Sequence, residues 1–363
     1  METFWYAAVT VMLAVYVVLD GFDFGVGIVY PFVARTETER RTALVSIGPV
    51  WNGNEVWLIA SGGLLFFAFP KAYAAGFSGF YLALIIVLWL LIFRGLALEL
   101  RSHLDHPLWR QFWDLTFAGA SLSLAIVFGA ALGNLIRGVP LNAEGYFFVA
   151  LWTDFAPGPK PGILDWYTVL VGLTSVAILA LHGANYLAMK TVGELYARAT
   201  AFARLSGWIT VGLTVLTVLA IPVVQPGLAR NYTAHPIGYL LPVTGVLALA
   251  ATLVLRRQQR DAGAFVTLSL FILAMLGSTA WGCYPNILIA TSDPMNSLTI
   301  FNATAGAPGV VRHRLQLDAR VHDRRLPRLL GKSPARSGIV PSRVDESLPR
   351  LAPPRRAMRH GKT

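Results

Sequence analysis

The sequence predicts an all-α fold, a polytopic bundle of transmembrane helices. The first observation is composition: 55% of the 363 residues are hydrophobic, only 13% are charged, and the mean hydropathy is +0.57, far from the averages of soluble domains. The second is the segment LDGFDFGVG at 19–27, which places Asp20 and Asp23 inside an otherwise apolar run. Carboxylates are costly in hydrocarbon and persist where they face a bundle interior. We therefore expect a membrane protein with a polar interior.

Eight apolar runs approach the roughly 20 residues that a spanning helix needs. They cover residues 5–30, 48–69, 76–98, 115–136, 167–189, 205–224, 237–255 and 264–284. The first run has no basic residue before it and no small-residue cleavage site after it, so we expect it to stay as a helix. The seventh run is the weakest, because it is the shortest and contains Pro242, although membrane helices tolerate proline.

The distribution of basic residues predicts the orientation, because cytoplasmic loops are enriched in Lys and Arg. The ends and connections that follow odd-numbered runs carry twelve such residues, whereas those that follow even-numbered runs carry four, Lys71, Arg137, Lys160 and Arg230. The N-terminus is therefore predicted to lie outside, with the long connection at 138–166 on the outer face. The predicted location is the cell inner (cytoplasmic) membrane, which the chain would cross many times.

The polar residues of the predicted helices gather in the half of the bundle that this topology makes cytoplasmic. In chain order they are Asp20, Asp23, Asn52, Asn54, Glu55, Arg94, Glu99, His103 and His182. A cluster of acids, Arg and His at one depth suits a proton-uptake path, an ion site or a buried ion-pair lock. The residue pattern alone leaves these three interpretations open.

Structural roles compete with functional ones at each of these positions. Asp20 and Asp23 lie three residues apart on one helix face, where both could pair with Arg94 and staple the first span to the third. Glu55 has no cation assigned to it, which favours a functional acid or a protonated, hydrogen-bonded one. His182, in LALHGANYL, is expected to be a hydrogen-bonded core histidine.

The chain offers few ligands for a cofactor of its own. Cys283 is the only cysteine, which excludes an intrachain disulfide and a Cys-based metal cage; we expect it to be apolar filler. The candidate haem ligands within the spans are His182, Met12, Met189 and Met275, and most of them lie at different depths. No Rossmann, P-loop or HExxH motif occurs. We expect no metal, no catalytic residue and no cofactor held by this chain alone.

The C-terminal part of the chain has a different composition. Nearly all of the net charge of +11 falls in residues 308–363, which contain twelve arginines and seven prolines. Such a segment is expected to be disordered. Because the rest of the chain is nearly neutral, the charge does not indicate binding to nucleic acid. The predicted domains are a transmembrane domain at 1–306 and a basic tail at 307–363.

Seven short motifs follow one another along residues 1–306. They are DGFDFGVG at 20–27, TERR at 38–41, VWNGNEVWL at 50–58, FSGFY at 77–81, GNLIRGVPLN at 133–142, TVGEL at 191–195 and NSLTIFNAT at 296–304. Together and in this order they resemble subunit II of the cytochrome bd quinol oxidases, including the cyanide-insensitive relatives. Seven ordered matches make the resemblance specific, whereas the first motif alone would not.

The resemblance implies a non-haem partner subunit in a terminal oxidase of the aerobic respiratory chain, which oxidises quinol and reduces dioxygen to water. Two b-type haems, haem d and the quinol site would belong to subunit I, against which this chain would pack. Quinone, membrane lipid and a small accessory subunit are the other partners that it implies. Proton and oxygen routes to haem d would run partly through this chain.

The proton route of the family uses acids on the second and third helices, and the matching positions here are Asn52 and Glu99, followed by His103. Asn52 departs from the aspartate of some members. Because an amide cannot carry a proton as an acid does, a route through this position would need water, with Glu55 as a substitute acid. These four residues, together with the two aspartates of the first span, form the predicted proton path.

Two further comparisons with the family concern an aromatic residue and the chain's C-terminal part. Trp57 matches a tryptophan that lies beside an oxygen route in some members. Members also continue into a ninth apolar helix, which is missing here. The switch after about Gly306 to Arg- and Pro-rich sequence resembles translation in a shifted reading frame; a genuine alternative tail is the other interpretation.

Two other classes of function remain open at this point. Carboxylates in Gly-rich helices also mark the ion and substrate sites of secondary transporters, whose halves are often related by an internal repeat. DGFDFGVG and VWNGNEVW have no counterpart after residue 150, which disfavours a transporter. In a non-catalytic membrane scaffold, Glu55, Glu99 and the two aspartates would not affect turnover.

Overall fold

The computed structural model describes residues 1–304, and these residues form an all-α bundle with one small β-ribbon. The helices are α1 (Glu2–Val33), α2 (Glu37–Ile47), α3 (Trp51–Ala68), α4 (Pro70–Gly79), α5 (Tyr81–Leu100), α6 (Pro107–Arg137), α7 (Trp166–Lys190), α8 (Gly193–Val224), α9 (Ala229–Ala234), α10 (Leu240–Arg257) and α11 (Asp261–Cys283). Strands β1 (Asn286–Leu288) and β2 (Leu298–Thr299) pair antiparallel. The predicted fold class is confirmed.

Every predicted apolar run overlaps helical structure, and within residues 1–304 seven helices are long and apolar enough to cross a membrane. The run at 48–69 corresponds to α3, which lies outside these seven and carries Asn52, Asn54 and Glu55 in its first turns. The number of spans and the outward position of the N-terminus stay predictions.

Three helix starts differ from the predicted boundaries, and one of them is that of α6, which begins at Pro107, eight residues before the apolar run at 115–136. The third apolar run predicts a helix from residue 76, but residues 70–79 form the separate helix α4, and the chain turns at Phe80 before α5 begins. Pro70 occupies the first position of α4, where its missing N–H costs nothing. Helix α8 begins at Gly193, twelve residues before the apolar run, because its first turns are polar and extend the helix beyond the apolar stretch.

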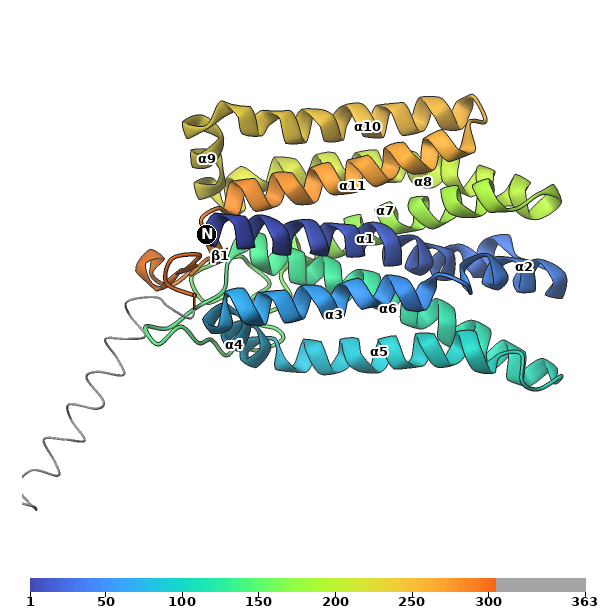
Figure 1. The fold of residues 1–363 in the computed structure, drawn as a ribbon, viewed down its shortest axis with the longest axis horizontal. Helices are drawn as coiled ribbons and strands as arrows, with labels where there is room; N and C mark the ends of the chain where they lie inside the picture. The colour runs from blue at the N-terminus through green and yellow to red at the C-terminus, as the bar shows by residue number, and fades with distance from the viewer. Residues whose placement is uncertain (305–363) are drawn as a thin grey trace, which may run out of the picture. The chain divides into compact units, whose positions relative to one another are not determined.

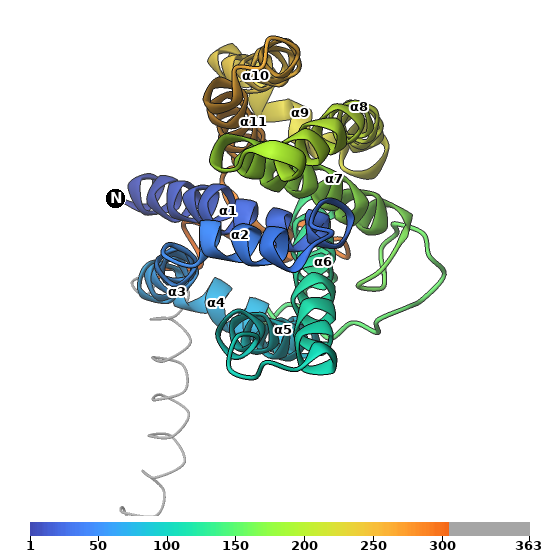
Figure 2. The same cartoon turned by 90° about the vertical axis from the view of Figure 1, so that its right-hand side faces the viewer.

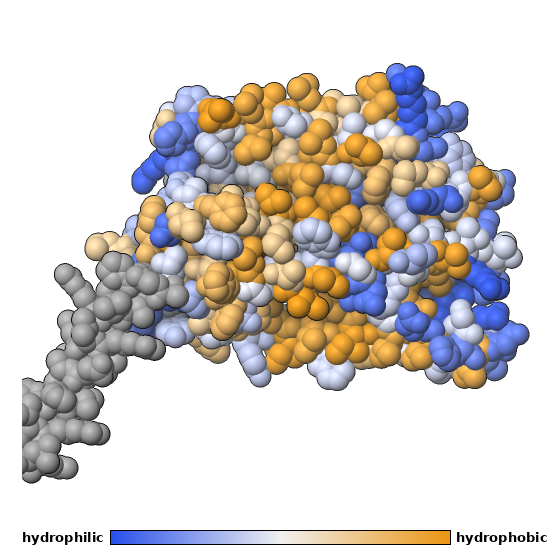
Figure 3. All heavy atoms as spheres, viewed as in Figure 1, coloured by the Kyte–Doolittle hydropathy of each residue, from blue (hydrophilic) through white to orange (hydrophobic). Residues whose placement is uncertain are grey.

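Helix α1 occupies the middle of the bundle. It contacts α3 and α6 on one side and α7 and α11 on the other, and both views show it between the group α3 to α6 and the group α7 to α11 (Figures 1 and 2). Side chains on the face in Figure 3 are mostly hydrophobic along the middle of the helices and hydrophilic at their ends. This banding is what a membrane-spanning bundle requires.

Glycines allow α1 and α7 to cross at very short distance. A Cβ atom on Gly25 would lie 2.0 Å from the carbonyl oxygen of Leu179, and one on Gly183 would lie 2.0 Å from the carbonyl carbon of Gly25. Neither position can hold a side chain without separating the two backbones. Small residues at such crossings are the usual basis of close helix packing in membranes.

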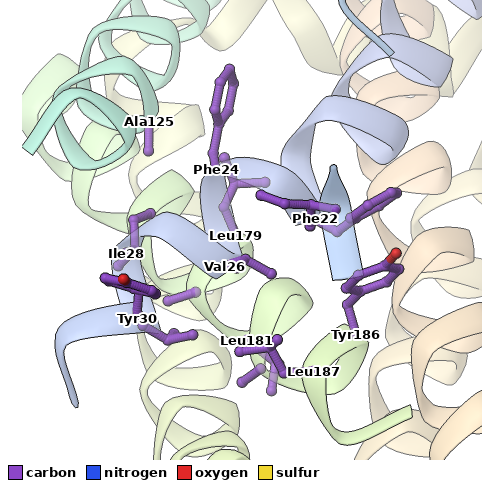
Figure 4. Close-up of a cluster of buried hydrophobic side chains, with 14 of the residues drawn as sticks. Phe22, Phe24, Val26, Ile28, Tyr30, Ala125, Leu179, Leu181, Tyr186 and Leu187 are labelled. Atoms are coloured by element: carbon purple, nitrogen blue, oxygen red, sulfur yellow. The ribbon is translucent and has the colours of Figure 1, made fainter. Parts of the chain in front are cut away.

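The largest hydrophobic core lies around this crossing (Figure 4). Phe22 of α1 stacks on Tyr186 of α7 with ring centroids 4.3 Å apart, and Phe265 of α11 contacts both rings edge-on or tilted. Aromatic contacts of this kind add to the stabilisation from burial. The core thus fixes the half of α1 that carries Asp20 and Asp23. The predicted basic tail at 307–363, and its frameshift interpretation, lie outside the described residues.

Candidate functional site

The polar cluster of the bundle is organised by Arg94 of α5. Its guanidinium is fully buried and donates from Nη1 to Asp20 Oδ1 at 2.7 Å and from Nη2 to Glu55 Oε1 at 2.6 Å. The same group lies over the ring of Phe24, 4.5 Å from its centroid. One arginine therefore joins α1, α3 and α5 through two charge-assisted hydrogen bonds and a cation–π contact.

Asp23 lies one turn further along α1 and is bonded by an amide instead of a cation. Asn54 Nδ2 donates to Asp23 Oδ2 at 2.8 Å and to the Leu19 carbonyl oxygen at 3.2 Å. Both Asp20 and Asp23 are completely buried, whereas Glu55 is 23% exposed. Glu55 is thus the member of the cluster that lies nearest the surface of this chain.

Four polar atoms around the cluster have no hydrogen-bond partner among residues 1–304. They are Tyr16 Oη, Asp20 Oδ2, Asp23 Oδ1 and Arg94 Nε. Buried polar atoms are nearly always paired with protein or ordered water. A carboxylate oxygen with unused acceptor capacity can bind a water or take a proton, so the cluster has the chemistry of a proton-holding site as well as that of an ion-pair lock.

Two details of the sequence interpretation are wrong. Glu55 does have a cation, because Arg94 reaches both Glu55 and Asp20. Asp23 does not pair with Arg94 and is bonded by Asn54 instead. The sequence could not show this, because Asn54 and Glu55 are neighbours on α3 and only the rotation of that helix decides which of them faces each aspartate. The predicted staple between α1 and α5 is present through Asp20.

The remaining predicted site residues lie apart from this cluster. Asn52 is exposed on α3, and Glu99 is exposed near the end of α5. His103 is also exposed, and its Nδ1 lies 3.0 Å from the backbone oxygen of Glu99. Trp57 is 36% exposed on α3. These four residues therefore lie on the surface of this chain and contribute nothing to the buried ion pairs.

His182 is a core histidine in this structure. Its side chain is completely buried, its Nε2 lies 3.0 Å from the Val18 carbonyl oxygen, and its ring stacks on Phe265 at 4.7 Å. The imidazole is thus packed between α1 and α11 and has no space for a haem plane beside it. Within the described range there is also no group of three or more His, Cys, Asp or Glu residues placed to hold a metal ion. The packing around His182 therefore does not suit an axial haem ligand.

A second ionic network, near the ends of α1, α5 and α6, was not predicted from the sequence. Asp114 of α6 is buried and accepts hydrogen bonds from Tyr30, Arg40 and Arg101. Arg101 also forms a two-pronged pair with Glu37 of α2, both bonds being 2.9 Å. Asp114 could have indicated this network in the sequence, because it is an acid within the helical segment 107–137. Arg40 and Arg101 could not, because in the sequence they indicate only that their loops are cytoplasmic.

Glu37 and Arg101 of this network hold each other in their ionised forms. The hydrogen bonds from Arg101 lower the pKa of Glu37 below its ordinary value. Burial alone would lower the pKa of Arg101, but the bonds to Glu37 and Asp114 outweigh it and raise that pKa. Pairing of this kind favours the charged state of each partner. The Glu37–Arg101 ion pair therefore ties α2 to the end of α5, and Arg101 extends the contact to α6 through Asp114.

The opposite end of the bundle has its own buried pair. Arg137, the last residue of α6, binds Asp165 and donates to Asn134 Oδ1 at 2.6 Å and to the Gly162 carbonyl oxygen at 3.0 Å. Asp165 also caps α7 through a hydrogen bond from the Thr168 backbone at 2.8 Å. This arrangement closes the long connection onto α6 and α7. The sequence pattern predicts only an outer position for Arg137 and not its partners.

The fold and the buried ion pairs define a multi-pass membrane protein with ionisable groups inside its helix bundle. Residues 1–309 match the sequence family described as "Cytochrome bd terminal oxidase subunit II", and the chain belongs to this family. The family also accounts for the location, the bacterial inner membrane.

Relatives agree with this assignment along most of the chain. "Cytochrome bd-I ubiquinol oxidase subunit 2" of Escherichia coli K12 is 34% identical over 327 residues, which cover 83% of this chain and 85% of that one. "Cytochrome bd ubiquinol oxidase subunit 2" of Bacillus subtilis 168 is 30% identical, with 83% and 86% covered. A chain of the bd oxidase structure from Geobacillus thermodenitrificans has the same fold, with a TM-score of 0.68, 21% identity, and 91% and 99% covered.

Proposed function

We propose that this chain is the haem-free partner subunit of a complex that oxidises quinol and reduces dioxygen to water. Relatives that are 30% and 34% identical are subunits named for ubiquinol oxidation, and the match covers 86% and 85% of their lengths. The haems, two b-type and one d-type, and the quinol site are placed in subunit I by this proposal. The surroundings of His182 support this placement of the haems, because the imidazole is enclosed by packing and offers no haem site.

The exposed face of α3 is the surface that we propose for subunit I. Its members recur every three or four residues: Asn52, Val56, Ile59, Gly63 and Phe66 are all exposed. If lipid covered this face, the side-chain amide of Asn52 would lie in hydrocarbon. A polar group without a hydrogen-bond partner is unfavourable there. A protein partner would both bond Asn52 and fill the open space beside Gly63, where no atom of the described residues lies within 4 Å of the place that a Cβ would take.

We propose that protons pass through this chain by way of the Arg94 cluster toward subunit I. The single observation that carries this proposal is the Glu55 carboxylate. It touches the buried Arg94–Asp20 pair on one side and is 23% exposed on the other. It also lies on α3, the helix proposed to meet subunit I. Glu99 and His103 would serve as an entry at the end of α5, since both are exposed there.

Oxygen access is the other role proposed for this region. Trp57 is partly exposed on α3, and its neighbours on the exposed face are apolar. Dioxygen is apolar and partitions into such surroundings. A route along the α3 side of the chain is therefore proposed to pass Trp57 on its way to subunit I.

The test compares catalysis with assembly in the complex co-expressed with subunit I. We expect Glu55→Gln and Glu99→Gln each to lower the oxidase rate per haem by about tenfold or more, because a proton-transferring group commonly contributes at least that much. Glu194→Gln is the control, since Glu194 is exposed on α8 and far along the chain from the cluster. The rate, the haem content and the yield of complex are measured on the same preparations.

The same measurements separate the proton route from a scaffold role. If the Glu55 and Glu99 variants lower the yield but keep normal turnover per haem, the acids stabilise the complex and the proton route is wrong. Glutamine keeps an oxygen that can accept a bond from Arg94 but carries no ionisable proton. A loss of turnover at normal yield would therefore report proton transfer and not a broken contact.

A further inference from the structure

Four arginines lie together where α8 approaches the end of α10. They are Arg204 of α8, and Arg256, Arg257 and Arg260 at the end of α10 and the turn that follows. The two helices meet closely here, because a Cβ on Gly207 would lie 2.8 Å from Leu253. Arg257 lies over the ring of Trp208, 5.8 Å from its centroid. Helix α10 ends at the upper right of Figure 1, where Figure 3 shows hydrophilic side chains.

Arg256 is the unusual member of this group. Its side chain is only 2% exposed, and among the described residues its one ion pair is with Asp261 through Nη2. Nε and Nη1 are buried and have no hydrogen-bond partner within the described part of the chain. A buried guanidinium edge without an acceptor is costly. Two donor nitrogens of Arg256 therefore lack the acceptors that their position demands.

The charge around Arg256 favours an anion as that acceptor. Arg204, Arg257 and Arg260 form no ion pair with any carboxylate of residues 1–304, so Asp261 is the single acid there that offsets the four cations. Like charges held close together repel one another. A negative group between Arg204 and Arg256 would relieve this repulsion and accept the unused N–H bonds.

The surface next to the arginines is apolar. Leu205 and Trp208 of α8 are 66% and 58% exposed, and Val254 of α10 is 52% exposed. They lie within about one turn of Arg204 and Arg257 on the same helices. A ligand that fits this surface has an anionic group at one end and hydrocarbon at the other.

We propose that the α8–α10 end is a binding site for the phosphodiester headgroup of a membrane phospholipid, with the acyl chains along Leu205, Trp208 and Val254. The phosphate oxygens would accept from the exposed Arg204 and Arg257 and, once these side chains move aside, from the buried Arg256 Nε and Nη1. Basic pockets between helices on the cytoplasmic side are suited to anionic headgroups, and this end carries the basic residues that predict a cytoplasmic position. The proposal stands on these contacts and is independent of the oxidase reaction.

The test uses the intact complex, delipidated in detergent and titrated with phosphatidylglycerol, with bound lipid counted by native mass spectrometry. The test variant is Arg204→Gln/Arg257→Gln, which changes only exposed side chains. The control is Arg230→Gln, an exposed arginine of the short helix α9, which follows the other end of α8. We expect the double variant to bind the lipid about 25-fold more weakly, about fivefold for each arginine removed, and the control to bind it normally.

Further arms identify the ligand and the role of Arg256. Arg256→Lys keeps the charge but removes the guanidinium edge, and we expect it to weaken phosphatidylglycerol binding while the complex still assembles. Phosphatidylcholine should bind through its phosphate, but more weakly because its headgroup is neutral overall. Inorganic phosphate that displaced the lipid at equal concentration would show a site for the free anion and overturn the lipid assignment. Equal lipid binding by the double variant and the Arg230 control would overturn the site itself.

Discussion

At the scale of single residues, the cluster depends on properties that only arginine combines. The guanidinium of Arg94 presents donors in two directions, which lets it bind Asp20 and Glu55 at the same time. Its flat face also rests on Phe24. An ammonium group would supply the charge but not this fixed fork, so the geometry that places Glu55 beside the buried aspartate is specific to arginine.

The positions of Asn52 and Glu55 allow a test of which position on α3 must carry a carboxylic acid for proton transfer. The two residues lie three positions apart on α3, so their side chains leave the helix on adjacent faces. We expect Asn52→Asp, introduced into the Glu55→Gln variant, to restore most of the lost oxidase rate, because it returns a proton-carrying group to the same turn. Asn54→Asp is the matched comparison.

Asn54 faces Asp23 in the interior, so an acid there would add like charge to a buried carboxylate and should lower yield instead of restoring rate. The measurement is turnover per haem in the single and double variants. Equal turnover of Glu55→Gln with and without Asn52→Asp would show that an acid at position 52 cannot replace Glu55.

The members of the buried cluster could largely be recognised from sequence, but their partners could not. Asp20, Asp23, Glu55 and Arg94 are conspicuous because charges are rare in apolar runs. Their pairing depends on the rotation of α3 by less than one turn, which decides that Asn54 faces Asp23 and Glu55 faces Arg94. Asp114 shows the opposite case, since its partners come from three different elements and no local pattern links them.

At the scale of elements, the helices could be located well from sequence because hydropathy and helix length agree in a membrane protein. Boundaries were predicted poorly where a helix continues beyond the apolar stretch, as at the polar first turns of α8. Helix α4 was not predicted, because Pro70 and Gly79 bound a short helix within sequence that looks like the approach to α5. Pro70 indicates a helix start in the sequence, but the apolar run that begins at residue 76 hides the end of this helix at Gly79.

The crossing of α1 and α7 should tolerate no side chain at its centre. We expect Gly183→Ala to destabilise the complex by about 1 to 3 kcal/mol or more, because its methyl group would collide with the backbone of Gly25 and force the helices apart. Gly212→Ala on α8 is the control, since no atom of the described residues lies within 4 Å of its Cβ position. The thermal midpoint of the purified complex measures both. A normal midpoint for Gly183→Ala would mean that the two helices do not pack at the distance seen here.

Helix α2 carries a pH-dependent contribution at its first turn. Thr36 and Glu39 form a capping box, and backbone N–H groups of Thr36 and Arg35, aided by Arg198, lower the pKa of Glu39 from 4.5 to about 2. Because the pKa is lowered in the folded state, the stabilisation is fully present above about pH 4.5 and is lost as the pH falls toward 2.

We therefore expect Glu39→Gln to lower the thermal midpoint at neutral pH, and the difference from the unsubstituted complex to shrink between about pH 4.5 and 2. The control is Glu194→Gln, which removes a weaker contact to the same Arg198 from a side chain that is 82% exposed. Melting curves recorded across this pH range supply the measurement. A difference that stays constant down to about pH 2 would contradict the assignment of this dependence to Glu39.

At the scale of the whole molecule, the exposed surfaces of α3 and α8 differ in a way that separates partner from lipid. Helix α8 exposes Leu216, Val218, Leu219 and Val223 along its apolar half, which suits contact with acyl chains. Helix α3 exposes the side-chain amide of Asn52 on the same face as Gly63, and this amide suits a protein partner better than acyl chains. Surfaces of the two kinds lie on opposite groups of helices, on either side of α1 (Figure 2).

This contrast predicts on which helix a larger side chain will prevent assembly with subunit I. We expect Gly63→Leu to reduce the amount of subunit I that co-purifies with this chain by about tenfold, because the added side chain would hold a packed partner helix away from α3. Gly212→Leu adds the same side chain to an equally open position on α8, where displaced lipid can rearrange, and should leave co-purification unchanged. Membrane levels of this chain, measured in parallel, separate loss of the partner from loss of the chain. Equal recovery of subunit I with both variants would place the contact on a helix other than α3, and the proton route through Glu55 would then need a different exit.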